Sequence, residues 1–275
     1  MSAGRLIVCP TPIGNLEDVT LRVLAALRAA DLVACEDTRH TRKLLDRYGV
    51  IAPLVSYHEH NERERSGELV AKMRKGSVVA LVSDAGMPLV SDPGFILVQA
   101  CIAAGLSVEV LPGPSSALAA LVASGLPAER WRFVGFLPRK KGELEKQLMG
   151  TPETLVAFES PQRLAATLAL LAGSDPQRPV AVCRELTKLH EEVRRGPAAA
   201  LAAHYEREPP RGEVVLVVGA APPGAAQPDA QERAITAMRA LVAAGARARP
   251  AAKALSELTG VPANRLYRAL TEGGE

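Results

Sequence analysis

The sequence predicts an α/β protein made of two tandem α/β domains and a small C-terminal helical extension. Short β-type runs alternate with helical stretches from residue 5 onward, and the alternation restarts after a Pro- and Gly-rich joint near residues 112–127. A Pro-, Ala- and Gly-rich segment then precedes three helical stretches. The boundaries that we expect are 1–112 and 113–220 for the two domains, 221–229 for a linker and 230–275 for the extension.

The first domain contains four strand-like runs and four helical ones. Its strands are expected near residues 5–9, 31–35, 77–83 and 106–113. Its helices are expected near residues 20–30, 38–48, 61–76 and 94–104. Strands that alternate with helices in this way are typical of a largely parallel sheet.

The second domain repeats the pattern, and the extension follows the linker. Its strands are expected near residues 154–160, 178–186, 191–196 and 212–220, and its helices near 161–173 and 197–208. Three helices are expected in the extension, near residues 231–245, 249–260 and 263–272. The short turn "TGVP" between the last two resembles a helix-turn-helix pair, although a compact three-helix cap would give the same pattern.

The composition fits a soluble cytoplasmic protein. A chain of 275 residues is long enough for about two cores. No apolar run approaches the roughly 20 residues of a membrane span, and the first ten residues are too mixed for a signal peptide. The four cysteines form no CxxC pair, so we expect neither disulfides nor a bound metal. The net charge is only +3, but cations cluster in "RHTRK", "PRKK", "VRR" and the tail, which permits an anionic partner.

Four loops rich in Gly and Pro follow strands of the first domain. They are "PTPIGN", "EDTRHT", "SDAGMPLVSDPG" and "PGPSS". In open α/β sheets, ligands bind at the carboxyl ends of the strands, where such loops converge. Proline stiffens these loops and glycine lets the backbone approach a ligand closely. Because the chain contains no GxxxxGK[ST] motif and no GxGxxG after the first strand, a nucleoside triphosphate or an ordinary dinucleotide is not indicated.

These loops and several further runs resemble the tetrapyrrole methylase superfamily, and most of all its members that act on ribosomal RNA. The runs span the chain from Arg5 to about Gly219, and in this order they are highly specific. They are "TPIGNLEDVTLR", "ACEDTRHTRKLL", "YHEHNE", "VSDAGMPLVSDPG", "PGPSSALAAL", "FVGFLPRKKG", "FESPQR", "CRELTKLHEE" and "RGEVVLVV".

The resemblance implies a methyltransferase that uses S-adenosylmethionine, bound in a cleft between the two domains, without a metal. It also implies that the reaction is 2′-O-methylation of a cytidine in the decoding region of 16S ribosomal RNA, within the small ribosomal subunit, and that the protein is a homodimer. The tetrapyrrole-modifying relatives usually carry a GxGPGD-like first loop. The run "PTPIGN" stands in its place here, which favours the RNA-modifying members.

Residues for the donor site follow from the resemblance by position. Asp84 has a competing role as a cap of its own loop or of the next helix. The residues implied for the donor are Pro12, Ile13, Asp84, Met87, Ser115, Ser116, Ala117 and Phe158.

A base that removes the proton of the acceptor hydroxyl is expected in "EDTRHTRK" or "YHEHN". Glu36 and Asp37 directly follow a strand, which directs at least one of them toward the cleft. Asp37 also suits a helix N-cap, and His58 also suits an ordinary surface position. The candidates are therefore Glu36, Asp37 and His58, without a choice among them.

Basic residues near the loops predict where RNA phosphates bind. Aromatic residues make up only 3% of the chain, too few for a base-stacking platform, so phosphate contacts and shape are expected to dominate recognition. The candidates are Arg39, Arg42, Arg139, Lys140, Lys141 and Arg163.

Two other functions fit parts of the sequence. A methyltransferase of the same fold that acts on a tetrapyrrole or another small molecule would need a large apolar bowl. A non-catalytic regulator that binds nucleic acid would use the helical extension for binding and the α/β part as a ligand sensor.

Overall fold

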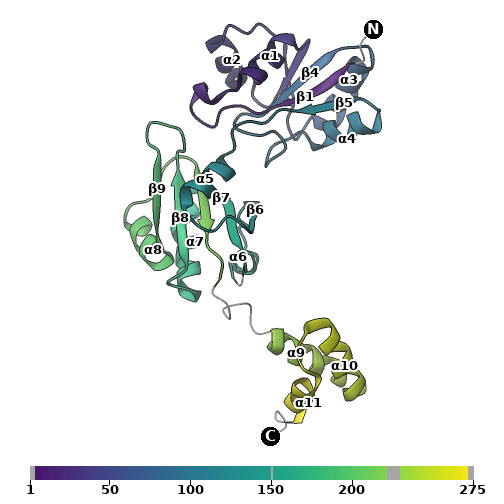
Figure 1. Cartoon of the computed structure of the whole chain (residues 1–275), viewed down its shortest axis with the longest axis vertical. Coiled ribbons are helices and arrows are strands. Elements are labelled where there is room, and N and C mark those ends of the chain that lie inside the picture. The colour runs from purple at the N-terminus through teal and green to yellow at the C-terminus, as the bar shows by residue number, and fades with distance from the viewer. Residues whose placement is uncertain (1–3, 150, 222–229, 272–275) are drawn as a thin grey trace.

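The computed structural model describes residues 4–149, 151–221 and 230–271. Two five-stranded sheets follow one another along the chain and α5 leads from the first to the second (Figure 1). The expected linker, 221–229, lies outside the described residues except for Ala221. Within the described residues, no helix is long and apolar enough to cross a membrane, and all four cysteines are buried free thiols.

The first lobe is a parallel sheet with helices on both faces. Its strands run in the order β3-β2-β4-β1-β5, and every neighbouring pair is parallel, as the sequence predicts. The elements are β1 (Arg5–Cys9), η1 (Leu16–Asp18), α1 (Leu21–Ala29), β2 (Leu32–Cys35), α2 (Thr38–Arg47), β3 (Leu54–Ser56), α3 (Glu62–Arg74), β4 (Val78–Val82), α4 (Phe95–Ala103) and β5 (Ser107–Val110).

Alternate residues of these strands face two separate cores. Ile7 of β1 packs with α1 and α2 on one face, whereas Leu6 packs with α3 and α4 on the other. Because both faces are covered, the strands are almost continuously apolar. The short strand β3 was not predicted, since its three half-buried residues give no periodic pattern.

The second lobe is a mixed sheet in the order β6-β7-β10-β8-β9. Only β6 and β7 are parallel; the other neighbours are antiparallel. The elements are α5 (Ser116–Ser124), β6 (Trp131–Phe136), α6 (Lys141–Leu148), β7 (Thr154–Glu159), α7 (Pro161–Ser174), β8 (Pro179–Arg184), β9 (Glu192–Pro197), α8 (Ala198–Arg207) and β10 (Val214–Val218).

The mixed order follows from two interleaved crossovers. Helix α7 joins the parallel strands β7 and β8, but β10 lies between them; α8 joins β9 and β10, but β8 lies between them. In the sequence, each strand–helix–strand unit therefore has the pattern of two parallel strands. In the sheet, however, a third strand lies between these two and runs antiparallel to both. Helices α6, α7 and α8 pack on one face, and α5 packs on the other together with Ile13 from the first lobe.

The extension is a three-helix bundle. Helices α9 (Ala230–Ala243), α10 (Ala248–Thr259) and α11 (Ala263–Thr271) lie close to the predicted bounds. They enclose a small core that contains Met238, Ala252 and Leu266. Gly260 ends α10 in the left-handed conformation, with φ of 72°, which explains the short turn before α11.

Candidate functional site

The four loops expected at one edge of the first sheet do meet there. They leave the carboxyl ends of β1, β2, β4 and β5, which lie at the same edge because the strands are parallel. Thr11 and Gly86 join the first loop to the third through two backbone hydrogen bonds of 2.9 and 3.0 Å. The Thr11 hydroxyl also donates to the carbonyl of Ser83 at 3.0 Å. The loops are therefore a connected structure.

Two glycines allow this close packing. Gly86 has a φ of 81°, and a Cβ there would lie 3.3 Å from Cγ2 of Ile13. A Cβ on Gly113 would lie only 2.3 Å from Cγ of Pro10. The positive φ favours glycine at position 86, whereas at position 113 glycine is required by space.

A cavity of about 450 Å³ lies between the loops of the first lobe and the sheet of the second. Its wall combines apolar groups, backbone and a few polar side chains, and its volume is in the range of small-molecule sites. Phe136 and Phe158 supply aromatic surface, with ring centroids 5.3 Å apart. The lining residues are Ile13, Ala85, Gly86, Met87, Val90, Ser91, Asp92, Ser115, Ser116, Ala117, Phe136, Phe158, Glu159, Ser160, Pro161, Cys183, Leu186, Gly212, Glu213, Val214 and Val215.

Six of the eight residues predicted for the donor line this interlobe cavity. The other two, Pro12 and Asp84, line an adjoining cavity of about 250 Å³ that shares Ile13 with the first. Asp84 accepts the backbone N–H of Asp37 at 3.2 Å, so it links the loop after β4 to the loop after β2. Ser115 is the N-cap of α5 and accepts the N–H of Leu118 at 3.5 Å. The six that line the interlobe cavity are Ile13, Met87, Ser115, Ser116, Ala117 and Phe158.

The three candidate bases lie beside the site, but none of them lines either cavity. Asp37 is the N-cap of α2 and accepts the Arg39 N–H at 2.8 Å; hydrogen bonds from Arg39 hold its pKa below the usual range. His58 Nε2 lies 3.2 Å from the side-chain amide nitrogen of Asn61. Glu36 is exposed, and desolvation together with the charge of Asp84 raises its pKa. A catalytic role for these residues stays a prediction.

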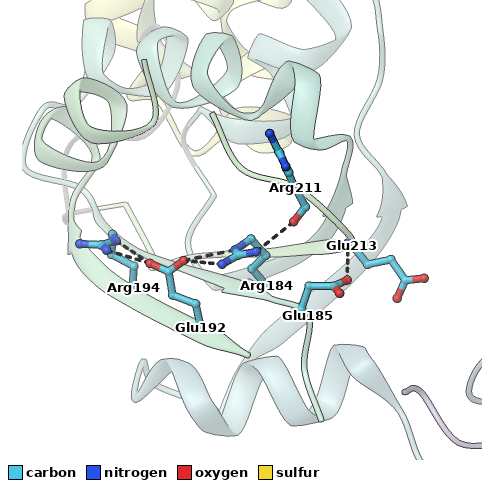
Figure 2. A network of polar contacts seen from close by, with 6 residues as sticks. All are labelled: Arg184, Glu185, Glu192, Arg194, Arg211 and Glu213. Atoms are coloured by element: carbon cyan, nitrogen blue, oxygen red, sulfur yellow. Dashed lines mark hydrogen bonds and ion pairs between the residues drawn. The ribbon is translucent and has the colours of Figure 1, made fainter. Parts of the chain in front are cut away.

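A network of polar contacts lies around the end of β8 and the start of β10 (Figure 2). Arg184 at the end of β8 contacts Glu192 at 3.1 Å, and Glu192 also contacts Arg194 at 2.8 Å. Glu185 accepts the backbone N–H of Glu213 at 2.9 Å, which holds the start of β10 against the cavity. Arg184 and Glu185 are neighbours in the chain, but they have different partners.

Lys188 adds a second link between the end of β8 and the start of β10. Its ammonium lies 2.9 Å from Glu185 and 3.1 Å from Glu213. Burial by itself lowers the pKa of Lys188, but the hydrogen bonds that Lys188 donates to Glu185 and Glu213 outweigh this effect and raise it. Lys188 therefore stays protonated and neutralises the carboxylates at this edge.

The predicted RNA contacts fall in two places. Arg39 and Arg42 are exposed on α2 beside the loops. Lys140 and Lys141 are exposed at the start of α6, where they pair with Glu143 at 3.3 Å and Glu145 at 3.9 Å. A groove of about 940 Å³ along α6 and α7 brings together three of the candidates, Arg139, Lys141 and Arg163.

Arg163 is half-buried, whereas the other predicted RNA contacts are exposed. It donates to the carbonyls of Leu137 and Pro138 at 3.1 and 2.6 Å, and it lies 3.3 Å from Glu159. These contacts tie α7 to the loop after β6. An RNA contact by Arg163 stays a prediction that its present partners do not favour.

Sequence reasoning missed Asp92, a carboxylate in the wall of the interlobe cavity. Burial, with the negative charges of Glu36 and Asp84 nearby, raises the pKa of Asp92 to about 6. The chain carries two similar runs, "SDAG" and "SDPG", in one loop. Only the second presents its Asp to this cavity, and the letters alone give no means to choose.

Comparisons with known proteins agree on one family. The family model described as Tetrapyrrole (Corrin/Porphyrin) Methylases matches residues 5–202. The chain is 48% identical over 272 residues to the protein of Mesorhizobium japonicum named Ribosomal RNA small subunit methyltransferase I, covering 97% of this chain and 91% of that protein. The protein of the same name from Thermotoga maritima is 44% identical over 217 residues, covering 78% of this chain and 98% of that protein.

Solved structures show the same fold. Uroporphyrin-III-C-methyltransferase from Thermus thermophilus matches with a TM-score of 0.59 and 26% identity, covering 79% of this chain and 94% of that chain. A structure of uroporphyrin-III C-methyltransferase from Thermus thermophilus complexed with S-adenosyl homocysteine matches with a TM-score of 0.55 and 22% identity, covering 78% and 97%. The fold class expected from the sequence is thereby confirmed.

Proposed function

Because the chain belongs to the tetrapyrrole (corrin/porphyrin) methylase family, we propose that it methylates a cytidine 2′-hydroxyl in the decoding region of 16S ribosomal RNA. The methyl donor in this proposal is S-adenosylmethionine. The observation that carries the substrate class is the 48% identity, over nearly the full length, to a protein named as a methyltransferase of small-subunit ribosomal RNA.

The interlobe cavity suits the donor chemically. S-adenosylmethionine combines an aromatic base, ribose hydroxyls, a zwitterionic amino acid and a sulfonium that supplies the methyl group. Phe136 and Phe158 offer aromatic surface for the base, and the carboxylate of Glu213 offers an acceptor for hydroxyls or the ammonium. The glycine at position 86 leaves room for a ligand against the backbone.

The chain's own residues would hold the donor from two sides. The first-lobe loops contribute Ile13 and Met87, and the start of α5 contributes Ser115, Ser116 and Ala117. Phe158 on β7 closes the opposite side. Holding both reactants in a fixed arrangement supplies a large part of the rate in such a transfer.

RNA would approach over the exposed cations near the cavity. Arg39 and Arg42 stand on α2, and Arg139, Lys140 and Lys141 stand before and at the start of α6. Cations of this kind grip phosphates without reading the bases. We also propose that the protein is a homodimer, as the family resemblance implies, which light scattering after size-exclusion chromatography would test.

Mass-spectrometric mapping tests the substrate. After incubation of the wild-type protein with S-adenosylmethionine and unmethylated small ribosomal subunits, we expect one new 2′-O-methylcytidine in the decoding region. A parallel incubation with a precorrin tests the small-molecule alternative. Methylation of the precorrin and not of the subunit would contradict the proposal.

Truncation after Asp229 tests the role of the extension. From Ala234 to Leu270 the bundle carries six cations, Arg239, Arg247, Arg249, Lys253, Arg265 and Arg268, against one anion, Glu257. We expect the truncated protein to keep its affinity for S-adenosylmethionine within about twofold, since the cavity is complete without the bundle. Its KM for small subunits should rise and depend less steeply on salt, because phosphate contacts are lost.

The two readouts of this truncation separate an enzyme from a regulator. The match to the Thermotoga maritima relative covers 98% of that protein but only 78% of this chain. A methyltransferase that lacks part of the present sequence is consistent with that match. A regulator that binds nucleic acid only through the extension would lose all RNA binding on truncation. Calorimetry with the donor and filter binding with subunits measure the two affinities.

A further inference from the structure

Three carboxylates line the interlobe cavity, and two of them already have cationic partners. Glu159 is almost fully buried; it accepts the Ser160 N–H at 2.7 Å and the Thr167 hydroxyl at 2.6 Å, and it lies 3.3 Å from Arg163. Glu213 lies 3.1 Å from the Lys188 ammonium. Both carboxylates are therefore already engaged by cationic side chains of the protein.

Asp92 is the third carboxylate, and no cation in the described part of the chain pairs with it. The hydroxyl of Ser83 interacts with Asp92 and lowers its pKa, but the same hydroxyl also donates to the carbonyl of Gly86 at 3.0 Å. Ser83 therefore stabilises the charge of Asp92 only weakly. A carboxylate in this position keeps lone pairs available to a ligand in the cavity.

The backbone around Asp92 holds it in place. Leu89 and Ser91 have φ angles of 73° and 66°, which side-chain-bearing residues rarely adopt, and Gly94 has a φ of 141°. Between Ser91 and Gly94, the ring of Pro93 fixes the φ angle of that residue. Strained backbone of this kind persists where the surrounding packing enforces it and concentrates at functional sites.

Like charges surround Asp92. Glu36 follows β2 and Asp84 follows β4, and these strands are neighbours in the sheet. Burial is the largest cause of the raised pKa of Asp92, the charge of Glu36 is next, and Asp84 adds to it, which brings the pKa to about 6. The remaining carboxylates of the cavity, Glu159 and Glu213, are offset by Arg163 and Lys188.

We propose that Asp92 is the catalytic base that removes the proton of the acceptor hydroxyl; this inference rests on the proposed function. As the hydroxyl oxygen forms its bond to the methyl carbon, the carbon–sulfur bond breaks and sulfur keeps the electron pair. Asp92 takes the hydroxyl proton and later releases it to water. The products are a methyl ether and a neutral thioether, so atoms and charge balance.

This assignment gives Glu36 a different role from the one expected from the sequence. Glu36 does not line the cavity, but its charge acts on Asp92. Glu36 therefore acts through Asp92: its negative charge raises the pKa of Asp92 and makes Asp92 a stronger base. A base whose pKa lies near the working pH is more effective than an ordinary carboxylate.

The kinetic test compares Asp92→Asn, Glu36→Gln and a control, Asp46→Asn, which removes a carboxylate from an exposed site on α2 outside the cavity. Asp92→Asn should lower kcat about 10²- to 10⁴-fold and change the donor Kd by less than about threefold. Asp46→Asn should behave as wild type.

The inference also predicts how kcat/KM changes with pH. Asp92 is active only when ionised, so kcat/KM of the wild type should fall as pH drops through about 6. Glu36→Gln removes a negative charge, which lowers the pKa of Asp92, so the acid limb should move to lower pH. A role of Asp92 in packing alone would not produce this shift.

A measurement without turnover tests the same inference. In ¹³C-NMR titrations of the ligand-free protein, one aspartate should titrate near pH 6, disappear in Asp92→Asn and shift down in Glu36→Gln. An Asp92 that titrates near pH 4, an Asp92→Asn variant with wild-type kcat, or loss of donor binding in that variant would overturn the inference. The inference would also be overturned if the fall of kcat/KM at low pH disappeared in Glu36→Gln but persisted in Asp92→Asn. If Asp92 titrates as expected but small subunits are not methylated, the proposed substrate fails.

Discussion

Ser116→Trp is expected to abolish binding of S-adenosylmethionine. Ser116 is the first residue of α5, is half-buried and lines the interlobe cavity. A large aromatic side chain buries on the order of 150–250 Å² of surface. At this position the indole ring would fill the space in which we propose that the donor binds. The helix should still form, because its N-cap is Ser115. We expect the donor Kd to rise at least about 100-fold, or about 2.7 kcal/mol.

Thermal denaturation with and without donor measures this effect. A ligand that binds only the folded protein raises Tm, so the wild type should be stabilised and Ser116→Trp should not be. Ala128→Trp is the matched control, since Ala128 is exposed after α5 and outside the cavity. Equal stabilisation of both variants by S-adenosylmethionine would show that the donor binds elsewhere.

Arg178→Met is expected to destabilise the second lobe by about 3–5 kcal/mol. The Arg178 guanidinium is only 2% exposed; it donates to Gly219 at 2.6 Å and to Thr151 at 3.4 Å, and it lies 3.6 Å from Asp175. Burial lowers its pKa, which the charge of Asp175 partly offsets. Methionine fills similar space but leaves the carbonyls and the carboxylate without a donor.

Urea denaturation measures the change in the free energy of unfolding. Arg207→Met is the matched control, because Arg207 is exposed on α8 and its guanidinium donates to Ala203 of the same helix at 3.1 Å. Its effect should stay below about 0.5 kcal/mol. A similar small effect of Arg178→Met would mean that water replaces the buried contacts.

Much of the first lobe could be predicted because its pattern is local. Continuous apolar strands, amphipathic helices and Gly- and Pro-rich loops each leave a mark within a few residues. The convergence of the loops followed from one further rule, that parallel strands end at the same edge. The six donor residues that line one cavity were predicted from the family resemblance and not from these local patterns.

Features that depend on distant parts of the chain could not be predicted in the same way. The antiparallel neighbours of β10 arise from how two crossovers interleave, which no local pattern records. Strand β6 was missed because its register shifts between Phe133 and Phe136, at Gly135 with a φ of 65°, so its alternation is broken.

The choice of functional side chains depended on the same distant contacts. Arg163 stays a predicted RNA contact, but the sequence does not show that carbonyls 25 and 26 residues away accept hydrogen bonds from its guanidinium. Asp92 differs from Asp84 only in what folds around it. Burial and the partners of each charge, which the sequence does not show, separate these roles.

A crystal structure of this chain with S-adenosylhomocysteine tests the central claim most directly. The account predicts one product molecule per chain in the interlobe cavity, between Ile13 and Met87 of the first lobe and Phe158 of the second, with its sulfur on the side of Asp92. Product bound at any other place, or an empty cavity at saturating concentration, would contradict it.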